Sequence, residues 1–396
     1  MIDRSLFIFD PAGESESMAG AYRAKLQGKN ATRINPWEFG SACVNPIIPL
    51  AEMIESGEDL GLYPNELANS FIPQAKSENT NAWVQRGASV LVSALLRHGV
   101  ILHGKRCTPG WVYDQIAGGR GTLETVFRHM FHSEDPVSMQ NAMRLEKLMK
   151  DSPRELAIIV DEATNHMLIY QEGSPPRRAT NYSDISPAEL KADPMTVFFQ
   201  VPGDQMAAAK QYVATIINCF IEGVAMANGP EHRTRTLFLL NEFTQMGKIA
   251  CIFKALHFYR KFGVQLLLVA HSRAAVEGIY GEEGRRDFEE NCEFMQILGT
   301  DDPGLIKSLS TWSGITTVET HDYSISGGPT PSVNHQIRRS TRPVLQAENI
   351  RSLAPDEQLI KYQNMPLLLA KRRFWKDDPK LSRVFDDPAD IPGIVK

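Results

Sequence analysis

The sequence predicts an α/β fold, a mostly parallel sheet flanked by helices and interrupted by a long all-helical segment. Five short apolar runs with little alternation are typical of strands that are buried on both faces. Helical periodicity fills most of the intervals between these runs, as it does in an open α/β sheet. The predicted strands are Leu6–Phe9, Thr196–Val201, Thr236–Leu240, Val264–Ala270 and Phe294–Gly299.

Three helices are expected between or after the later strands. Gln205–Asn228 places its apolar residues on one stripe, and Lys248–Phe262 shows the same spacing. A third helix should begin at Pro303, because proline suits the first helical position and the aspartate before it, Asp301 or Asp302, can cap the helix.

The long interval between the first two predicted strands is mostly helical in pattern. Trp83–His98, Thr122–Phe131 and Asn141–Met149 each carry apolar residues at helical spacing. Glu155–Tyr170 fits either a strand or a helix, and this choice stays open.

Domain boundaries follow from these patterns. We predict that residues 1–59 and 194–396 build the sheet domain and that residues 60–193 form an all-α insert. A C-terminal hairpin is expected over Glu357–Phe374, where Asn364-Met365-Pro366 supplies the turn.

The composition excludes some classes of protein. A net charge of −5 and a pI near 6.1 give no overall electrostatic footprint for nucleic acid. Small basic clusters such as Arg177-Arg178 and Arg338-Arg339 either line a local site or are solvated surface charge. Five dispersed cysteines indicate a reducing compartment. No run of about 18 apolar residues is present, so we expect a soluble chain without a transmembrane segment.

The main candidate site follows the strand Thr236–Leu240, which ends in the polar pair Asn241-Glu242. Ligands of open α/β sheets bind at the carboxyl ends of strands. A glutamate there can act as a general base toward water. A neutral asparagine holds Mg²⁺ less strongly than an aspartate would. The alternative interpretation is a turn or capping pair with no catalytic role.

Asp10, Glu14 and His271 are further candidates, because they also follow predicted strands. They would face the same cleft as Asn241-Glu242 if those strands are neighbours. The segment Phe9–Glu14 fits an Asp-Pro turn equally well, and His271 fits a helix cap.

No Gly-x-x-x-x-Gly-Lys-Ser/Thr phosphate loop occurs in the sequence. Gly99–Arg106 fits the pattern up to its lysine, but Arg106 stands where serine or threonine is required. Its loop positions are bulky, whereas a phosphate cradle needs small residues, so we interpret the match as coincidence. His129 and His132 have no third ligand in view, and we predict no metal site there.

Several collinear segments resemble type IV secretion coupling proteins of the TraG kind, relatives of the FtsK-like DNA pumps. Together they cover almost the whole chain in the family's order. They are Phe7–Glu14, Ile34-Asn35-Pro36, Val44–Ile47, Ser183–Leu190, Pro194–Pro202, the strand ending in Glu242-Phe243, Leu267–Val269, Ile279–Gly281, Asn291-Cys292, Gly299–Pro303, Arg342–Leu345 and Leu367–Phe374.

The resemblance implies a RecA-like nucleotide-binding domain with an inserted all-α domain that faces the substrate. It implies ATP and Mg²⁺ as cofactors, and it places Glu242 as the catalytic base beside Asn241, Asp10, Glu14 and His271. Arg260 falls where some members carry an arginine finger. The implied partners are secretion-channel components and either a relaxase–DNA complex or effector proteins. The full-length family is expected to form hexamers on the cytoplasmic side of the bacterial inner membrane.

Departures from the family pattern lower the expected activity. The family begins with membrane helices, a strand and a P-loop, and this sequence starts after their position. Asn241 replaces the Walker B aspartate, Ala12 replaces a lysine and His271 replaces a common glutamine. We therefore expect a coupling-protein-like chain without autonomous ATP hydrolysis. Two alternatives stay open: an ATPase completed by a P-loop segment supplied in trans, or a substrate-binding scaffold only.

Overall fold

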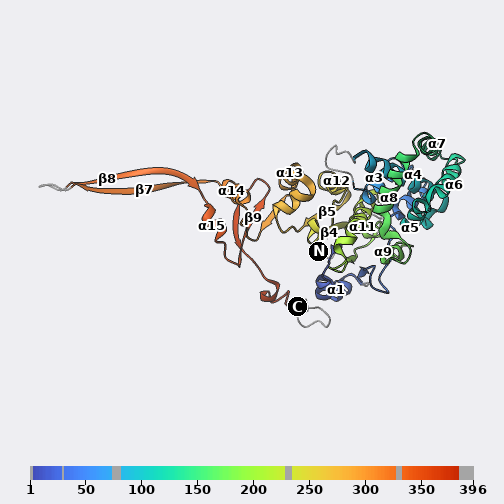
Figure 1. Ribbon diagram of the computed structural model, residues 1–396. Coiled ribbons are helices and arrows are strands. Elements are labelled where there is room, and N and C mark those ends of the chain that lie inside the picture. Colours follow the sequence, from blue (N-terminus) through green and yellow to red (C-terminus); the bar gives the residue numbers. More distant parts are fainter. Residues whose placement is uncertain (1–2, 29–30, 74–81, 228–233, 327–331, 383–396) are drawn as a thin grey trace. The chain divides into compact units, whose positions relative to one another are not determined.

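The computed structural model describes residues 3–28, 31–73, 82–227, 234–326 and 332–382 (Figure 1). The chain divides into two compact units, one within residues 1–281 and the other within residues 282–383. Each unit is described separately. The predicted boundaries near residues 60 and 193 both fall inside the first unit and stay a prediction.

The first unit is built on a five-stranded, all-parallel sheet with the strand order β2-β3-β1-β4-β5. This confirms the predicted parallel α/β sheet. Phe9 pairs with Phe199 on one side and with Leu240 on the other, so the three central strands end level. The strands are β1 (Arg4–Phe9), β2 (Thr32–Ile34), β3 (Thr196–Phe199), β4 (Arg235–Leu240) and β5 (Val264–Leu268).

Helices α1 (Glu14–Gln27) and α11 (Met206–Met226) cover opposite faces of this sheet. The Phe199 ring packs 5.9 Å from that of Tyr212 in α11, whereas Phe198 faces Gly20 of α1. Neighbouring side chains of a strand point to opposite faces, so the two helices lie on different sides. The continuous apolar runs are explained by this double burial.

Two further helical elements lead into β5. The predicted helix Lys248–Phe262 is instead α12 (Ile252–His257) followed by the 3₁₀ turn η4 (Tyr259–Phe262). Gly263 ends the turn at φ 85°, a conformation that glycine adopts without steric cost. The short helix α10 (Glu189–Ala192) precedes β3. The end of the predicted helix Gln205–Asn228 at Asn228 lies outside the described residues.

The segment between β2 and β3 is helical, as predicted, and the ambiguous stretch Glu155–Tyr170 is helical too. The described elements are α2 (Ile48–Glu55), α3 (Tyr63–Phe71), α4 (Ala82–His103), η1 (Gly104–Arg106), α5 (Pro109–Ala117), α6 (Gly119–Phe131), α7 (Pro136–Asp151), α8 (Pro153–Met167), η2 (Leu168–Tyr170) and α9 (Pro175–Ala179).

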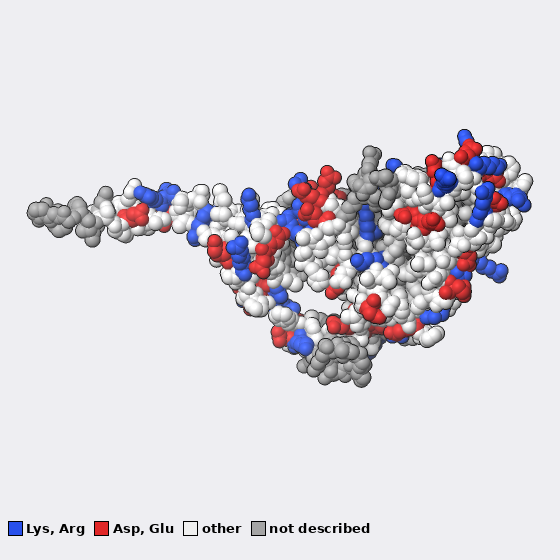
Figure 2. Space-filling view, in the orientation of Figure 1, with Lys and Arg blue, Asp and Glu red and all other residues white. Residues whose placement is uncertain are grey.

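Helix α4 is the centre of this helical segment and packs against α3, α7 and α8. The stretch Ala82–Arg106 is long and apolar enough to cross a membrane, yet 67% of its most apolar window is buried inside the protein. Core helices pass the same test, so this helix does not indicate a membrane span. Figure 2 shows Lys and Arg interspersed with Asp and Glu over the visible face of this segment.

The helical segment is fixed onto the sheet domain through α11. The Thr215 hydroxyl donates a hydrogen bond to the Ser70 carbonyl at the end of α3, at 2.9 Å. The buried Tyr170 ring lies between the rings of Phe71 and Tyr212, 5.7 and 6.4 Å away. These buried contacts join α3 and η2 of the helical segment to α11.

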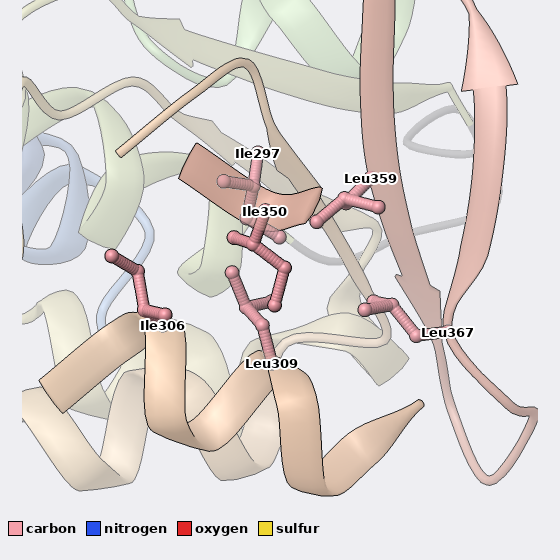
Figure 3. Packing of buried hydrophobic residues seen from close by; sticks show 6 residues of the cluster. All are labelled: Ile297, Ile306, Leu309, Ile350, Leu359 and Leu367. Atoms are coloured by element: carbon pink, nitrogen blue, oxygen red, sulfur yellow. The ribbon is translucent and has the colours of Figure 1, made fainter. Parts of the chain in front are cut away.

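The second unit has a small antiparallel sheet, β10-β9-β6, and a packed helix. Its core consists of Ile297, Ile306, Leu309, Ile350, Leu359 and Leu367 (Figure 3). Asp302 caps α14, as predicted, by accepting a hydrogen bond from the Gly304 amide at 2.8 Å. The elements are β6 (Phe294–Ile297), α14 (Pro303–Trp312), α15 (Ala347–Arg351), β9 (Glu357–Tyr362), β10 (Leu368–Lys371) and η5 (Trp375–Asp377).

The predicted strand Phe294–Gly299 does not belong to the parallel sheet. It forms β6, which pairs antiparallel with β9 in the second unit. A short apolar run does not identify its pairing partner, and the fifth parallel strand is instead β2, only three residues long. The predicted hairpin over Glu357–Phe374 is confirmed as β9 and β10.

A long antiparallel ribbon was not expected from the sequence. Strands β7 (Ile315–Ser326) and β8 (Ser332–Pro343) pair over twelve residues and form a two-stranded sheet of their own. Polar residues and threonines interrupt the apolar pattern of both strands, so the sequence did not predict the ribbon. Helix α13 (Arg273–Asn291) precedes β6 and is broken at Gly281, whose φ is 81°.

Candidate functional site

The carboxyl ends of β1, β4 and β5 bring most of the predicted site residues to one edge of the sheet. Asp10 directly follows Phe9, and Asn241 directly follows its partner Leu240. Leu240 pairs in turn with Leu268, three residues before His271. Adjacent parallel strands therefore deliver Asp10, Asn241-Glu242 and His271 to the same edge, where ligands of such sheets bind.

Glu242 adopts a left-handed backbone conformation, with φ 52° and ψ 41°. Residues with a β-carbon adopt it rarely. Hydrogen bonds from the Val269 amide to Leu240 and from the Phe243 amide to Val269, each 3.0 Å, fix the turn. Phe243 begins the 3₁₀ turn η3 (Phe243–Gln245) and is buried against Tyr280, with ring centroids 6.0 Å apart. Buried neighbours thus hold Glu242 in a strained position.

The Glu242 carboxylate contacts His271 across the two strand ends. Its Oε1 lies 3.5 Å from Nε2 of His271, and the two side chains are 39% and 66% exposed. Asn241 beside them is half-buried. A ligand in solution therefore has access to a carboxylate, an imidazole and an amide at one place.

Asp10 is occupied by its own turn. Its side chain is 2% exposed, and Oδ2 accepts a hydrogen bond from the Glu16 amide at 3.0 Å, while its carbonyl accepts one from Gly13. These two hydrogen bonds belong to the Asp-Pro turn, and the Asp10 amide donates a third to the Phe199 carbonyl of β3 at 2.8 Å. Glu14 begins α1 and is exposed.

Glu16 and Gln200 were not predicted as site residues from the sequence. Nε2 of Gln200, directly after β3, donates a hydrogen bond to Oε2 of Glu16 at 2.7 Å. Gln200 is buried, and its amide donates to Ile34 of β2. A polar residue directly after a buried strand was the available signal, the same that pointed to Asn241.

Arg260 lies at the opposite edge of the sheet. It belongs to η4, which precedes β5, and the Gly263 carbonyl next to it accepts a hydrogen bond from Thr236 at the start of β4. Strands of five residues separate the two edges by roughly 16 Å. The fold does not bring Arg260 to Glu242 within one chain.

The charges at the carboxyl edge suit a cation better than a phosphate. Carboxylate and amide oxygens are ligands that Mg²⁺ accepts, and Asn241 and Glu242 supply both kinds. Phosphate binds where a helix N-terminus is open to it, but Glu14 and Glu16 occupy the first turn of α1. Arg33 of β2 comes within 4.0 Å of Glu16, so one guanidinium lies near this edge. Asn241 and Glu242 supply oxygen ligands that fit the metal and water part of an ATP site.

No group of three or more His, Cys, Asp or Glu side chains with metal-binding geometry occurs in the described part of the chain. A bound Mg²⁺ at the carboxyl edge would therefore take most of its ligands from water or from a nucleotide, as this ion often does.

Known proteins that are similar to this chain belong to type IV secretion or conjugation systems. The family described as "Type IV secretory system Conjugative DNA transfer" matches residues 1–391. The type IV secretion system-coupling protein VirD4 of Bartonella quintana is 26% identical over 383 residues, which cover 92% of this chain. The conjugal transfer protein TraG of Escherichia coli is 23% identical over 380 residues, or 90% of this chain. The chain spans 58% and 57% of the length of these relatives.

Solved structures show the same fold. The unbound bacterial conjugative coupling protein TrwBdeltaN70 superposes with a TM-score of 0.69 at 17% identity, covering 93% of this chain and 78% of that one. The plasmid coupling protein TrwB in complex with ADP and Mg²⁺ superposes with a TM-score of 0.64 at 14% identity, covering 95% and 80%. At this identity the likeness establishes the fold, which confirms the RecA-like expectation.

Proposed function

The chain belongs to the type IV secretory system conjugative DNA transfer family, and on that premise we propose that it couples DNA or protein substrates to a type IV secretion channel. The observation that carries the proposal is the match along nearly the whole chain. The plasmid coupling protein TrwB, which has the same fold, forms a complex with ADP and Mg²⁺, and this supports a nucleotide-linked role for the present chain. The proposed partners are channel components and either a relaxase–DNA complex or effector proteins.

Glu242 is the proposed general base of the carboxyl edge. Its exposed carboxylate can accept a proton from a water molecule, and the His271 imidazole at 3.5 Å orients that carboxylate. Asn241 would contribute an amide oxygen to Mg²⁺, without the charge that an aspartate adds. Bound ATP and Mg²⁺ would supply the transferable phosphoryl group and the charge that stabilises its transfer.

Arg260 is proposed to serve a neighbouring subunit rather than its own. Because it lies at the opposite edge of the sheet from Glu242, it can approach a glutamate of this kind only in another copy. Arginine fingers supplied in trans act in this way on phosphoryl transfer. This role fits the homo-hexamer expected of the full-length family at the inner membrane.

The chain on its own is proposed not to hydrolyse ATP. The chain contains no phosphate loop, and Asn241 stands where a charged metal ligand would serve best. Calorimetric titration with Mg²⁺ and a non-hydrolysable ATP analogue tests this directly. We expect no binding, and micromolar binding or a motor-like hydrolysis rate would overturn it.

An ATPase completed in trans is the second candidate function, and the free edge of β5 favours it. β5 is the last strand of the described parallel sheet, and Leu267 and Val269 are 43% and 45% exposed there. Parallel sheets normally bury both faces, so this edge suits a further strand. Co-expression with a polypeptide that carries a strand and a phosphate loop should restore binding of the ATP analogue. No binding in the co-purified complex would leave the scaffold alternative.

Residues 60–193 are proposed as the substrate-facing part in every one of these alternatives. The test is recovery of a relaxase or an effector with the tagged full chain from cells that assemble a type IV secretion system. Recovery of neither would contradict the coupling function itself.

A further inference from the structure

A groove of about 930 Å³ opens on the helical segment, between α3, α4, α7 and α8. It is formed by regular helical stripes rather than by loops. Along α4 the lining residues are Trp83, Arg86, Gly87, Ser89 and Val90, and all but Ser89 stand at positions i, i+3, i+4 and i+7. These positions share one face of a helix.

The opposite wall follows the same rule. Along α7 the lining residues are Arg144, Leu145, Lys147, Leu148 and Asp151, and all but Leu145 stand at i, i+3, i+4 and i+7. Ile159 of α8 contributes to the floor. Two straight helical walls over an apolar floor match the shape of a groove that accepts a helix or an extended segment.

Gly87 determines the depth of this groove. A β-carbon at this position would lie 2.6 Å from Cδ1 and 2.8 Å from Cγ1 of Ile159. Any larger residue would push α8 away from α4 and displace Ile159, which forms the floor of the groove. The close approach of the two helices therefore depends on the absence of a side chain here.

The groove carries three cations that form no ion pair with the described residues. Arg86, Arg144 and Lys147 are exposed, and no ion pair involves them among the residues that the structure describes. Two carboxylates, those of Asp151 and Glu155, lie near the junction of α7 and α8. The remainder of the groove is therefore positive, beside the exposed indole of Trp83.

We propose that this groove binds an amphipathic segment of a substrate protein, with apolar side chains on the floor and carboxylates against Arg86, Arg144 and Lys147. The inference rests on the proposed coupling function and specifies the substrate segment that residues 60–193 would recognise. Apolar anchors in a groove give affinity, and charges at its rim give selectivity and a faster encounter.

A protein segment fits better than a nucleic acid. A phosphate backbone is negative along its whole length, so part of it would meet Asp151 and Glu155. A peptide can place acidic residues along the middle of α7 and neutral or basic ones at that end. Grooves that bind single-stranded nucleic acid also present several aromatic platforms, whereas Trp83 is the only aromatic side chain among the described residues that line this groove.

The test uses the purified full chain and labelled amphipathic peptides of about 20 residues, with leucine on one face. One peptide carries glutamate on its polar face and the other carries lysine. Fluorescence anisotropy should show the acidic peptide binding at least about tenfold more tightly, a difference of about 1.4 kcal/mol. Equal affinity, or tighter binding of the lysine peptide, would overturn the proposal.

A matched pair of variants locates the binding. Arg144→Glu with Lys147→Glu reverses two groove charges, and Arg106→Glu with Arg128→Glu makes the same change at exposed sites outside the groove. We expect the groove variant to bind the acidic peptide about tenfold more weakly and the control to stay within about twofold. Similar losses in both variants would show a general charge effect and refute the groove.

Trp83 gives an optical readout at the site itself. The difference between the emission of the parent chain and that of Trp83→Phe isolates one indole of the five in the sequence. Its emission should shift to shorter wavelength when the acidic peptide covers it, and an unchanged difference spectrum would count against the groove.

Two further outcomes separate this inference from the function on which it rests. Single-stranded DNA that binds more tightly than both peptides, and loses affinity in the groove variant, would make this a nucleic-acid site and overturn the proposal. If the groove variant still recovers a relaxase or effector from cells as the parent chain does, the coupling function stands and the groove is not its recognition site.

Discussion

Nε2 of His271 lies 3.5 Å from Oε1 of Glu242, and the two residues follow adjacent strands of the parallel sheet. The contact joins β4 and β5 at the edge where a nucleotide would bind in this fold. Both side chains are accessible, so the contact contributes little to stability.

His271→Ala should change the free energy of unfolding by less than about 1 kcal/mol, because exposed ion pairs contribute little. Urea denaturation followed by circular dichroism measures this. A loss of several kcal/mol would mean that the pair is buried in solution, contrary to its exposure here.

Glu242→Gly should raise the free energy of unfolding by between zero and about 1 kcal/mol. Glycine adopts a positive φ without strain, and the entropy that it loses on folding offsets part of this gain. Glu242→Val should instead destabilise it, since a branched β-carbon is strongly disfavoured there. The same urea titration compares the two variants. Equal destabilisation by both would show that the Glu242 side chain, and not its backbone conformation, is what matters.

An ion pair between the buried Arg97 and the half-buried Asp135 joins α4 to the start of α7. Two guanidinium nitrogens of Arg97 donate to the two carboxylate oxygens of Asp135, each at 2.7 Å, and Asp135 also caps α7 by accepting from the Ser138 amide. Asp135→Ala should cost about 3–5 kcal/mol, because it leaves a buried guanidinium unpaired. The double variant Asp135→Ala with Arg97→Met should recover part of the lost free energy of unfolding. A double-mutant cycle over the parent, the two single variants and the double variant measures this.

The same pair makes stability depend on pH. Hydrogen bonding to Arg97 holds the pKa of Asp135 well below its usual range. A carboxyl whose folded pKa is depressed stabilises the fold above its unfolded pKa of about 3.9, and that contribution is lost as pH falls through the folded value. Stability of the parent chain should therefore fall more steeply below about pH 4 than that of Asp135→Asn. Parallel curves would contradict the assignment.

Gly87→Ala should destabilise the helical segment by about 1–3 kcal/mol, despite the better helix propensity of alanine, because its β-carbon would overlap Ile159. Adding Ile159→Val removes Cδ1, the atom at 2.6 Å, and should recover part of the loss. Thermal unfolding of the single and double variants measures this. Purely additive losses would mean that α8 moves freely to accommodate the methyl group.

Leu309→Ala should cost about 2–5 kcal/mol in the second unit, because Leu309 is fully buried in a core of few residues. Hydrogen exchange resolves where the loss occurs. We expect faster exchange of amides in residues 282–383, with the amides of β1 unchanged. Faster exchange in both units would show that they unfold together.

The parallel sheet was predictable because its strands are short apolar runs between amphipathic helices. The apolar pattern gave the wrong sheet where contacts between distant segments decide which strands pair. Phe294–Ile297 looks like a buried strand but pairs antiparallel with β9. Thr32–Ile34 is too short to stand out, yet its place beside β3 makes it part of the sheet.

Only the site residues that directly follow a predicted strand could be predicted from the sequence. Asn241-Glu242 and His271 follow apolar runs, so parallel pairing alone brings them together. The hydrogen bond between Glu16 and Gln200 spans 184 positions of sequence, and no local pattern reports such a contact. Arg260 was assigned from a resemblance, and only the strand direction shows that it lies at the far edge.

The β7–β8 ribbon gives the second unit a long mechanical reach. Twelve residues in each strand extend about 40 Å, at about 3.4 Å per residue. Gly314 stands directly before β7 with φ 78°. At a rise of about 3.4 Å per residue, a rotation of about 10° there would sweep the far end through roughly 7 Å. A slight change of angle at the base of the ribbon would therefore displace its far end by more than the length of one residue.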